Sequence, residues 1–202
     1  MLLAIDSGNT NIVFSLFDGE VQKGVWRRSN DNRSTADEYG VWFLQLLSLA
    51  KIDRGVIDSA IIATVVPDTL FNLRSLCSNY FNVKPIVIGD PGLDLGIDVL
   101  VESPDSVGAD RLVNAVAAHN KYRGPLIILD FGTATTFDII DELGNYVGGV
   151  IAPGINLSVE ALHQAAAMLP RVSVERTATV IGKRTTTAMQ SGIYWGYVGL
   201  IE

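Results

Sequence analysis

The N-terminal part of the chain alternates between short apolar runs and polar turns. Apolar runs at 2–5 and 12–17 flank a polar stretch, and a third run follows the Asp18–Gly19 turn over about 21–28. Brief apolar and β-branched runs bounded by Gly, Asn and Asp are typical of strands. The pattern therefore predicts two strands around an opening loop, with a third strand after the turn.

The next apolar positions recur at the spacing of a helix. Thr35 and Glu38 form a capping box, which predicts that a helix begins here. The apolar residues expected near one face of this helix are Val41, Leu44, Leu47 and Leu49. Further along, the pattern predicts buried strands at 59–66 and 84–89, a helix from Pro67 to about residue 81, and a helix at 108–122 that follows a glycine-rich connection.

The pattern restarts after residue 125. The stretch 126–154 is expected to form strand, polar loop, strand, turn and strand. A helix at about 156–168, a short strand near 172–175 and a helix over 185–202 complete the expected elements. The last helix reaches the end of the sequence without a cap or breaker, and we therefore expect the natural chain to continue.

The restart is an internal repeat. The segment "LLAIDSGNTNIVFSLFD" aligns with "LIILDFGTATTFDIID", so that Asp6 matches Asp130 and Gly8 matches Gly132, 124 positions apart. A repeat of this length indicates a duplicated domain rather than a solenoid. We expect an α/β fold of two duplicated domains, 1–122 and 123–202, with mixed β-sheets flanked by helices and the second domain truncated at its C-terminal end.

The repeated loops suit a phosphate. Glycine lets the backbone approach a phosphate closely, and the Asn9 and Thr133 side chains supply neutral donors. An aspartate at the strand end repels phosphate but can hold Mg²⁺ that bridges to it. One such loop alone is a weak signal, because it is also a plausible hairpin turn; the pair favours a clamp for a nucleotide's phosphate tail. A Walker A motif and a G-x-G-x-x-G motif after a strand are both missing from the sequence.

Between the two loops, Asp110 and Arg111 are expected in the first turn of a helix. Acids favour helix N-termini for electrostatic reasons alone, which is one interpretation. The other is that Asp110 is the general base for an attacking hydroxyl, with Arg111 holding an anionic group. The two histidines, His119 and His163, are expected to pack or lie at the surface.

The composition limits the kinds of binding partner that we expect. The net charge of −7 and the pI near 4.8 argue against a nucleic-acid or anionic-membrane partner. Cys77, the single cysteine, excludes an intrachain disulfide and is expected to be buried. The N-terminus lacks the features of a signal peptide, and no apolar run is long enough to span a bilayer, so we expect a soluble cytoplasmic protein.

Taken together, the motifs resemble those of the type III pantothenate kinases. The matching stretches are "DSGNTN" (6–11), "GADR" (108–111), "DFGTATTFD" (130–138), "GGVIAPG" (148–154) and "GKRTTTAMQSGIYWGYVGLIE" (182–202). They occur in the family's order and cover nearly the whole chain. That family belongs to the actin-like ATPase superfamily, whose two ribonuclease-H-like domains agree with the duplication.

The resemblance implies an activity and a set of site residues. The activity is phosphorylation of pantothenate to 4'-phosphopantothenate with ATP, the first step of coenzyme A biosynthesis. Asp110 would be the catalytic base, and Asp130 would bind a monovalent cation, K⁺ or NH₄⁺. Asp6 would also lie near Mg²⁺ through the phosphates. The implied ATP-binding residues are Asp6, Ser7, Gly8, Asn9, Thr10, Asn11, Ile12, Val13 and Thr133. The implied pantothenate-binding residues are Gly108, Ala109, Asp110, Arg111 and Thr185.

The resemblance also implies a homodimer whose substrate pocket is completed near the subunit interface. The tail 189–200 is a plausible interface element, and core packing is an equal alternative. Two other functions stay open at this point. One is a kinase of the same superfamily that acts on a sugar or small acid, and the other is a non-enzymatic regulator that senses nucleotide.

Overall fold

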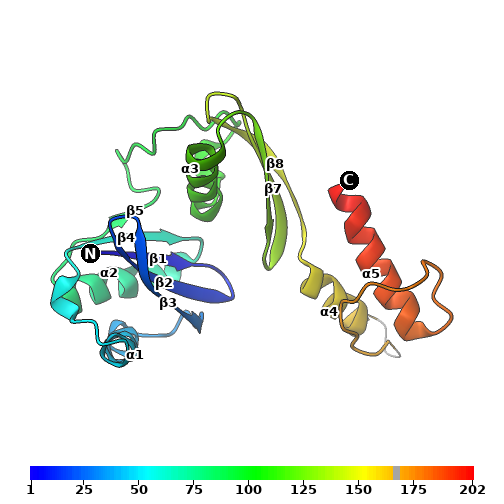
Figure 1. Cartoon of the computed structure of the whole chain (residues 1–202), viewed down its shortest axis with the longest axis horizontal. Coiled ribbons are helices and arrows are strands. Elements are labelled where there is room, and N and C mark those ends of the chain that lie inside the picture. Colours follow the sequence, from blue (N-terminus) through cyan, green and yellow to red (C-terminus); the bar gives the residue numbers. More distant parts are fainter. Residues whose placement is uncertain (166–168) are drawn as a thin grey trace.

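The computed structural model describes residues 1–165 and 169–202, and this part of the chain contains two β-sheets (Figure 1). The strands of the first sheet lie in the order β3-β2-β1-β4-β5. Neighbours among β1, β2 and β3 are antiparallel, whereas β4 is parallel to β1 and β5 is parallel to β4. The strand bounds are β1 Leu2–Ser7, β2 Asn11–Asp18, β3 Val21–Ser29, β4 Ser59–Thr64 and β5 Ile86–Val87.

Two helices make the connections that the parallel strands require. Helix α1 (Ala36–Leu49) precedes β4, and helix α2 (Pro67–Phe81) links β4 to β5. Both begin where the sequence predicts. The Thr35–Glu38 capping box is formed, and Pro67 occupies the first turn of α2, where its missing N–H leaves no hydrogen bond unmade.

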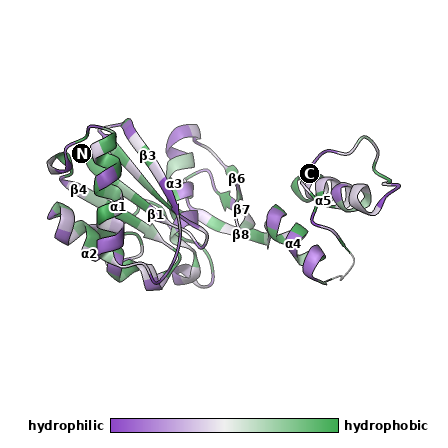
Figure 2. Ribbon diagram, turned by 90° about the horizontal axis from the view of Figure 1, so that it is seen from below, coloured by the Kyte–Doolittle hydropathy of each residue, from purple (hydrophilic) through white to green (hydrophobic). Residues whose placement is uncertain are grey.

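Alternation along β1 separates the core from the other face of the sheet. Leu3 and Ile5 are buried together with residues of α1 and α2, and the Phe14 ring lies 5.1 Å from the Phe43 ring of α1. Figure 2 shows hydrophobic residues concentrated along β1 and the helices beside it. Because side chains alternate along a strand, Asp6 lies on the face opposite this core.

The second sheet is an antiparallel meander, β6-β7-β8. Helix α3 (Ala109–Tyr122) packs on one face of it, where Leu112 and Ala115 meet Ile140 and Tyr146. Residues between Leu95 and Val107 join the same cluster. The strand bounds are β6 Leu126–Phe131, β7 Ala134–Ile140 and β8 Tyr146–Pro153.

The two meanders, β1-β2-β3 and β6-β7-β8, follow the same antiparallel course, as expected for duplicated α/β units. Their loops differ by one residue, because Ser7 pairs with Ile12 whereas Phe131 pairs with Thr135. The repeat offset is therefore 124 before the loop and 123 after it. The division at residue 122 stays a prediction, and the structure packs α3 with the second sheet.

The C-terminal part lies beyond β8, on the side away from the first sheet (Figure 1). Helices α4 (Ile155–Ala165) and α5 (Thr185–Ile201) contact each other, and the hydroxyls of Ser158 and Tyr197 are 3.2 Å apart. The predicted helix at 156–168 thus corresponds to α4, and its last three positions lie outside the described residues. Among the described residues, none of the helices is long and apolar enough to cross a membrane.

Two predictions about the first helix and the second parallel strand are wrong in part. Val41 and Leu49 are 65% and 75% exposed, because the sheet-facing positions of α1 are those around Tyr39, Phe43 and Leu47. Leu49 follows Leu47 by two positions, which turns it to the other side of the helix. The strand expected at 84–89 is formed only over β5, where Ile86 is 54% exposed.

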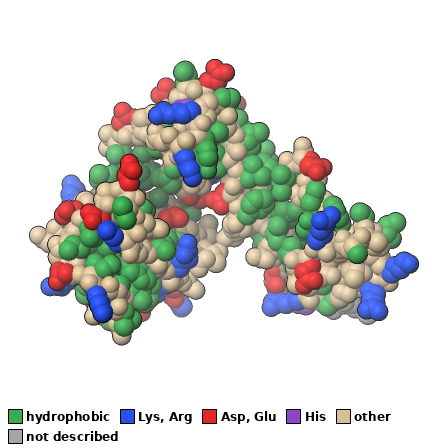
Figure 3. All heavy atoms as spheres, viewed as in Figure 1, with side chains coloured by type: hydrophobic (Ala, Val, Ile, Leu, Met, Phe, Trp, Pro, Cys, Tyr) green, Lys and Arg blue, Asp and Glu red, His purple; other side chains and the backbone are tan. Residues whose placement is uncertain are grey.

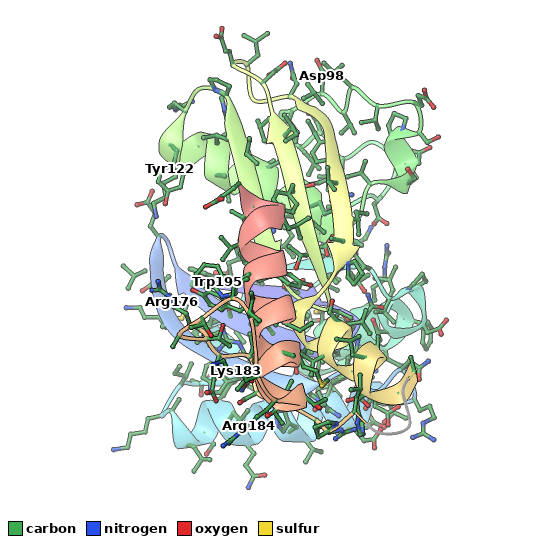
Figure 4. All side chains as sticks on the ribbon, turned by 90° about the vertical axis from the view of Figure 1, so that its right-hand side faces the viewer. Asp98, Tyr122, Arg176, Lys183, Arg184 and Trp195 are labelled. Carbon is green, nitrogen blue, oxygen red and sulfur yellow. The ribbon has the colours of Figure 1, made fainter. Side chains whose placement is uncertain are left out.

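The prediction of a strand near 172–175 is also wrong, because no strand pairs with this segment in the described part of the chain. Its groups bond to α5 instead: Gln190 Nε2 donates to the Ser173 carbonyl at 3.2 Å. Farther on, Trp195 Nε1 donates to Thr177 Oγ1 at 3.1 Å. Arg176 lies 5.7 Å from the Trp195 ring, and Figure 4 shows the two side by side. These contacts replace a strand ladder.

Candidate active site

A pocket of about 650 Å³ lies where the β1–β2 loop faces the β6–β7 loop. In the space-filling view of Figure 3 this region is a hollow between the two sheets with acidic side chains near it. The first loop and its strand ends contribute Asp6, Gly8, Asn9, Thr10, Asn11 and Val13. The other lining residues are Val65, Asp110, Asp130, Phe131, Gly132, Thr133, Ala134, Thr136, Asn156 and Leu157.

Hydrogen bonds within the hairpin and from Asn30 hold the first loop in place. The Gly8 N–H donates to the Asn11 carbonyl at 3.0 Å, which closes the turn. Asn30, just after β3, donates from Nδ2 to the Gly8 carbonyl at 2.6 Å and from its backbone N–H to the Thr10 carbonyl at 2.8 Å. The sequence analysis missed Asn30, although its place in the polar run after β3 is a weak signal.

The second loop is built in the same way and touches the first. The Gly132 N–H donates to the Ala134 carbonyl at 2.9 Å, and the Gly154 N–H donates to the Thr133 carbonyl at 3.0 Å. A Cβ at Gly154 would meet the backbone of this loop, so glycine is needed for the close approach. The hydroxyls of Thr10 and Thr133 are 2.8 Å apart, which joins the two loop tips across the pocket.

Three aspartates line this pocket: Asp6 near the end of β1, Asp130 near the end of β6, and Asp110 in the first turn of α3. The pKa of Asp6 is raised above its usual range, first because the packed surroundings disfavour its charge and then because Asp110 and Asp130 repel it. Such a concentration of negative charge favours a cation. Among the described residues, no group of three acidic, histidine or cysteine side chains is close enough to hold a metal ion alone. Carboxylate oxygens are ligands of hard cations, which often keep water or phosphate oxygens as further ligands.

Asp110 is fixed at the first turn of α3. Its Oδ1 accepts the backbone N–H of Arg111 at 2.8 Å. A Cβ at the preceding Gly108 would lie 2.5 Å from the same oxygen, so the carboxylate rests on bare glycine backbone. Asp130 is more exposed, and Asn114 Nδ2 lies 3.4 Å from its Oδ2.

Arg111 lies behind Asp110 and is anchored in the second sheet. Its Nη2 and Nε lie 2.6 and 2.7 Å from Oδ1 of the fully buried Asp138. The Tyr146 hydroxyl donates to that same oxygen at 2.8 Å. The sequence analysis gave no role to Asp138 or Tyr146; the signal was an acid on an inward position of an apolar strand.

Several predicted site residues do not line the pocket. Ser7 is buried with its hydroxyl 3.0 Å from Thr69, and Ile12 is buried in the first core, so any contact from these two with a nucleotide involves backbone. Of 108–111, only Asp110 is part of the lining. Thr185 begins α5; Figure 4 shows the preceding Lys183 and Arg184 at the end of that helix away from Tyr122 of α3. The roles of all these residues stay predictions.

Two solved structures have a fold similar to that of this chain. One is described as a Baf family transcriptional activator from Campylobacter jejuni, 20% identical, with a TM-score of 0.57 over 98% of this chain and 77% of that one. Another is described as a 2-dehydro-3-deoxygalactonokinase from Sinorhizobium meliloti, 12% identical, with a TM-score of 0.56 over 100% of this chain and 81% of that one. These likenesses show the fold alone, and the chain shares the mixed α/β fold of both proteins.

Sequence comparison shows the family of the chain. The family model described as type III pantothenate kinase matches residues 2–202. A type III pantothenate kinase of Rhodospirillum rubrum is 65% identical over 202 residues, which is all of this chain and 79% of the relative. One from Zymomonas mobilis is 57% identical over 204 aligned positions, 100% of this chain and 74% of the relative. The chain belongs to the type III pantothenate kinase family.

Proposed function

We propose that this chain phosphorylates pantothenate to 4'-phosphopantothenate with ATP, which is the first step of coenzyme A biosynthesis. Membership of the family supports the reaction and its substrates. The observation that carries the proposal here is the pocket itself, because Asp110 shares it with both hairpin loops. A carboxylate beside two phosphate-suited loops is an arrangement that suits transfer of a phosphoryl group to a hydroxyl.

In this proposal the loops bind the phosphates of ATP, and Asp110 acts as the general base. The phosphate tail of ATP lies between the Gly8–Asn11 loop and the Gly132–Thr133 turn, whose glycines let phosphate oxygens reach the backbone. Asp110 accepts the proton of the pantothenate hydroxyl as its oxygen attacks the γ-phosphorus. ADP leaves with the bridging oxygen's electron pair. Positioning and charge neutralisation supply most of the rate in such transfers.

Two cations fit the acidic residues of the pocket. Asp6 would hold Mg²⁺ through its waters and the phosphates, and Asp130 would bind K⁺ or NH₄⁺. A bound cation supplies charge neutralisation for the phosphates in such a site. The raised pKa of Asp6 supports this role, because a cation beside it relieves the repulsion from Asp110 and Asp130.

The remaining substrate contacts come from α3 and α5. Gly108, Ala109 and Arg111 flank Asp110 at the start of α3, where the helix N-terminus favours an anion such as the pantothenate carboxylate. Thr185 lies on α5, outside the pocket lining of this single chain. We propose a cytoplasmic homodimer in which a second chain completes the pocket near α5.

The decisive experiment measures ADP release by the full-length protein with pantothenate, with and without K⁺, for wild type and Asp110→Asn. We expect turnover that requires both pantothenate and K⁺, and at least a hundredfold loss in Asp110→Asn, in the range that general-base catalysis supplies. ATP binding by calorimetry should stay within about threefold of wild type. Asp105→Asn serves as a matched control outside the pocket, and it should turn over like wild type.

The alternatives give other results. Turnover with a sugar or small acid in place of pantothenate would assign the chain to another kinase of the superfamily. ATP binding without turnover of any acceptor, equal in wild type and Asp110→Asn, would favour a nucleotide-sensing regulator.

A further inference from the structure

One edge of the Arg111 guanidinium is hydrogen-bonded to a buried carboxylate. Nε and Nη2 both point to Asp138 Oδ1, at 2.7 and 2.6 Å. The Tyr146 hydroxyl donates to the same oxygen, and the Arg111 guanidinium carbon lies 5.6 Å from the Tyr146 ring centre. Asp138 is fully buried, and Arg111 is 16% exposed. A charge pair this enclosed exchanges little with water, so it fixes orientation.

The backbone shapes the space around the pair. A Cβ at Gly149 would collide with the Phe137 carbonyl and with Arg111 Nη2, so the guanidinium lies directly against bare backbone of β8. Burial and the hydrogen bond to Asp138 raise the pKa of Tyr146 to about 12, which keeps its proton in place for donation at physiological pH. The anchor therefore combines a carboxylate, a phenol and a glycine from β7 and β8.

Other carboxylates near Arg111 could pair with its guanidinium. Arg111 follows Asp110 directly, and Asp110 lies close enough to Asp6 to raise the Asp6 pKa. A guanidinium free to turn would pair with these pocket carboxylates and occupy the place of the proposed cation. The buried anchor holds it away from them, while Nη1 stays unused by any hydrogen bond among the described residues.

We propose that Asp138, supported by Tyr146, is a positioning residue that holds the Arg111 guanidinium toward the pantothenate anion and away from the pocket aspartates. This role rests on the proposed function, since it concerns the same site. Asp138 acts only through Arg111 and touches neither ATP nor the reacting atoms.

A double-mutant cycle tests the role. Arg111→Lys, Asp138→Asn and the double variant are compared for the KM of pantothenate, the KM of ATP and kcat, with folding checked by thermal melting. Loss of a charged hydrogen bond predicts a rise of roughly tenfold or more in pantothenate KM for Asp138→Asn. ATP KM should stay within about twofold. The double variant should be no worse than Arg111→Lys alone, because one change acts through the other.

Controls separate positioning from a purely structural role. Asp90→Asn breaks an Arg–Asp pair of the same length but greater exposure, Arg74–Asp90 at 2.6 Å, away from the pocket lining, and it should leave pantothenate KM unchanged. If Asp138→Asn does not fold, Tyr146→Phe replaces it in the cycle; a smaller rise in pantothenate KM that is again absent in the Arg111→Lys background supports the role. Additive effects in either cycle, or equal rises in the KM of both substrates, overturn it. A wild-type protein that does not phosphorylate pantothenate overturns the proposed function itself.

Discussion

Gly8→Ala should separate the fold of the first loop from its function. In the free chain a methyl group at this position is tolerated, since its nearest neighbour would be the Asn11 carbonyl oxygen at 3.5 Å. That is an ordinary van der Waals distance. Gly8 also lacks the positive φ that would make alanine strained. The glycine is therefore not needed by the fold, and we attribute it to the close approach of a phosphate.

The effect on stability follows from these distances. Alanine in an unstrained glycine position reduces the freedom of the unfolded chain and stabilises a protein by about 0.4–1 kcal/mol. For a chain of this size, that corresponds to a rise in Tm of about 1–4 °C. We therefore expect Gly8→Ala to melt at the wild-type temperature or slightly above it.

Gly8→Ala should weaken ATP binding strongly, although it leaves the stability of the fold unchanged or slightly higher. The added methyl projects from a loop that lines the pocket, where it would keep phosphate oxygens from the backbone N–H groups. Losing one hydrogen bond to a charged group costs about 1.5–3 kcal/mol, which is roughly a 10- to 150-fold rise in ATP Kd. Calorimetric titration of ATP and a thermal melt of the same sample measure both quantities.

Gly199→Ala is the matched control. It adds the same methyl in open space of the single chain near the end of α5, outside the pocket lining. Because 189–200 is a candidate interface segment, the oligomeric state of this variant is measured beside ATP Kd, and neither should change. Wild-type ATP affinity in Gly8→Ala would refute the assignment of this loop to phosphate. A drop in Tm of several degrees would show instead that the loop has no room for the methyl.

Three other predictions test the electrostatics of the pocket and the packing of the first sheet with its helices. The pKa of Asp6 is raised in the folded state, so the folded chain binds its proton more tightly than the unfolded chain does and loses stability as pH rises above 3.8. Asp6→Asn should remove this loss, melt above wild type at pH 7 and abolish turnover. A pH profile of Tm equal to that of wild type would contradict this prediction. Thr35→Ala breaks the capping box and should cost about 1 kcal/mol, or about 2–4 °C in Tm, with ATP Kd unchanged. Burial raises the pKa of Cys77 to about 12, so a thiol reagent at pH 8 should label it only after urea unfolds the protein, and fast labelling of the native chain would argue against its burial.

The sequence predicts the local structure well where one residue type has one physical use. The capping box at Thr35, the proline at position 67 and the duplicated hairpins all have this property, and the structure contains each of them. The errors arise where tertiary contacts decide. The apolar residues of α1 outnumber the positions that can face the sheet, and the segment at 172–175 has strand-like residues but no strand beside it.

The anchor of Arg111 shows why part of the site lies beyond sequence reasoning. The pairing of Arg111 with Asp138 joins a helix to a strand 27 residues later, and that distance is set by the packing of α3 on β7. Nothing in the spacing of either residue specifies the other. The hairpin loops, in contrast, are local, so their glycines and aspartates are adjacent in sequence as well as in space. The chemistry that we propose for the loops can therefore be predicted from the sequence. The orientation of Arg111, which we propose meets the substrate, can be seen only in the fold.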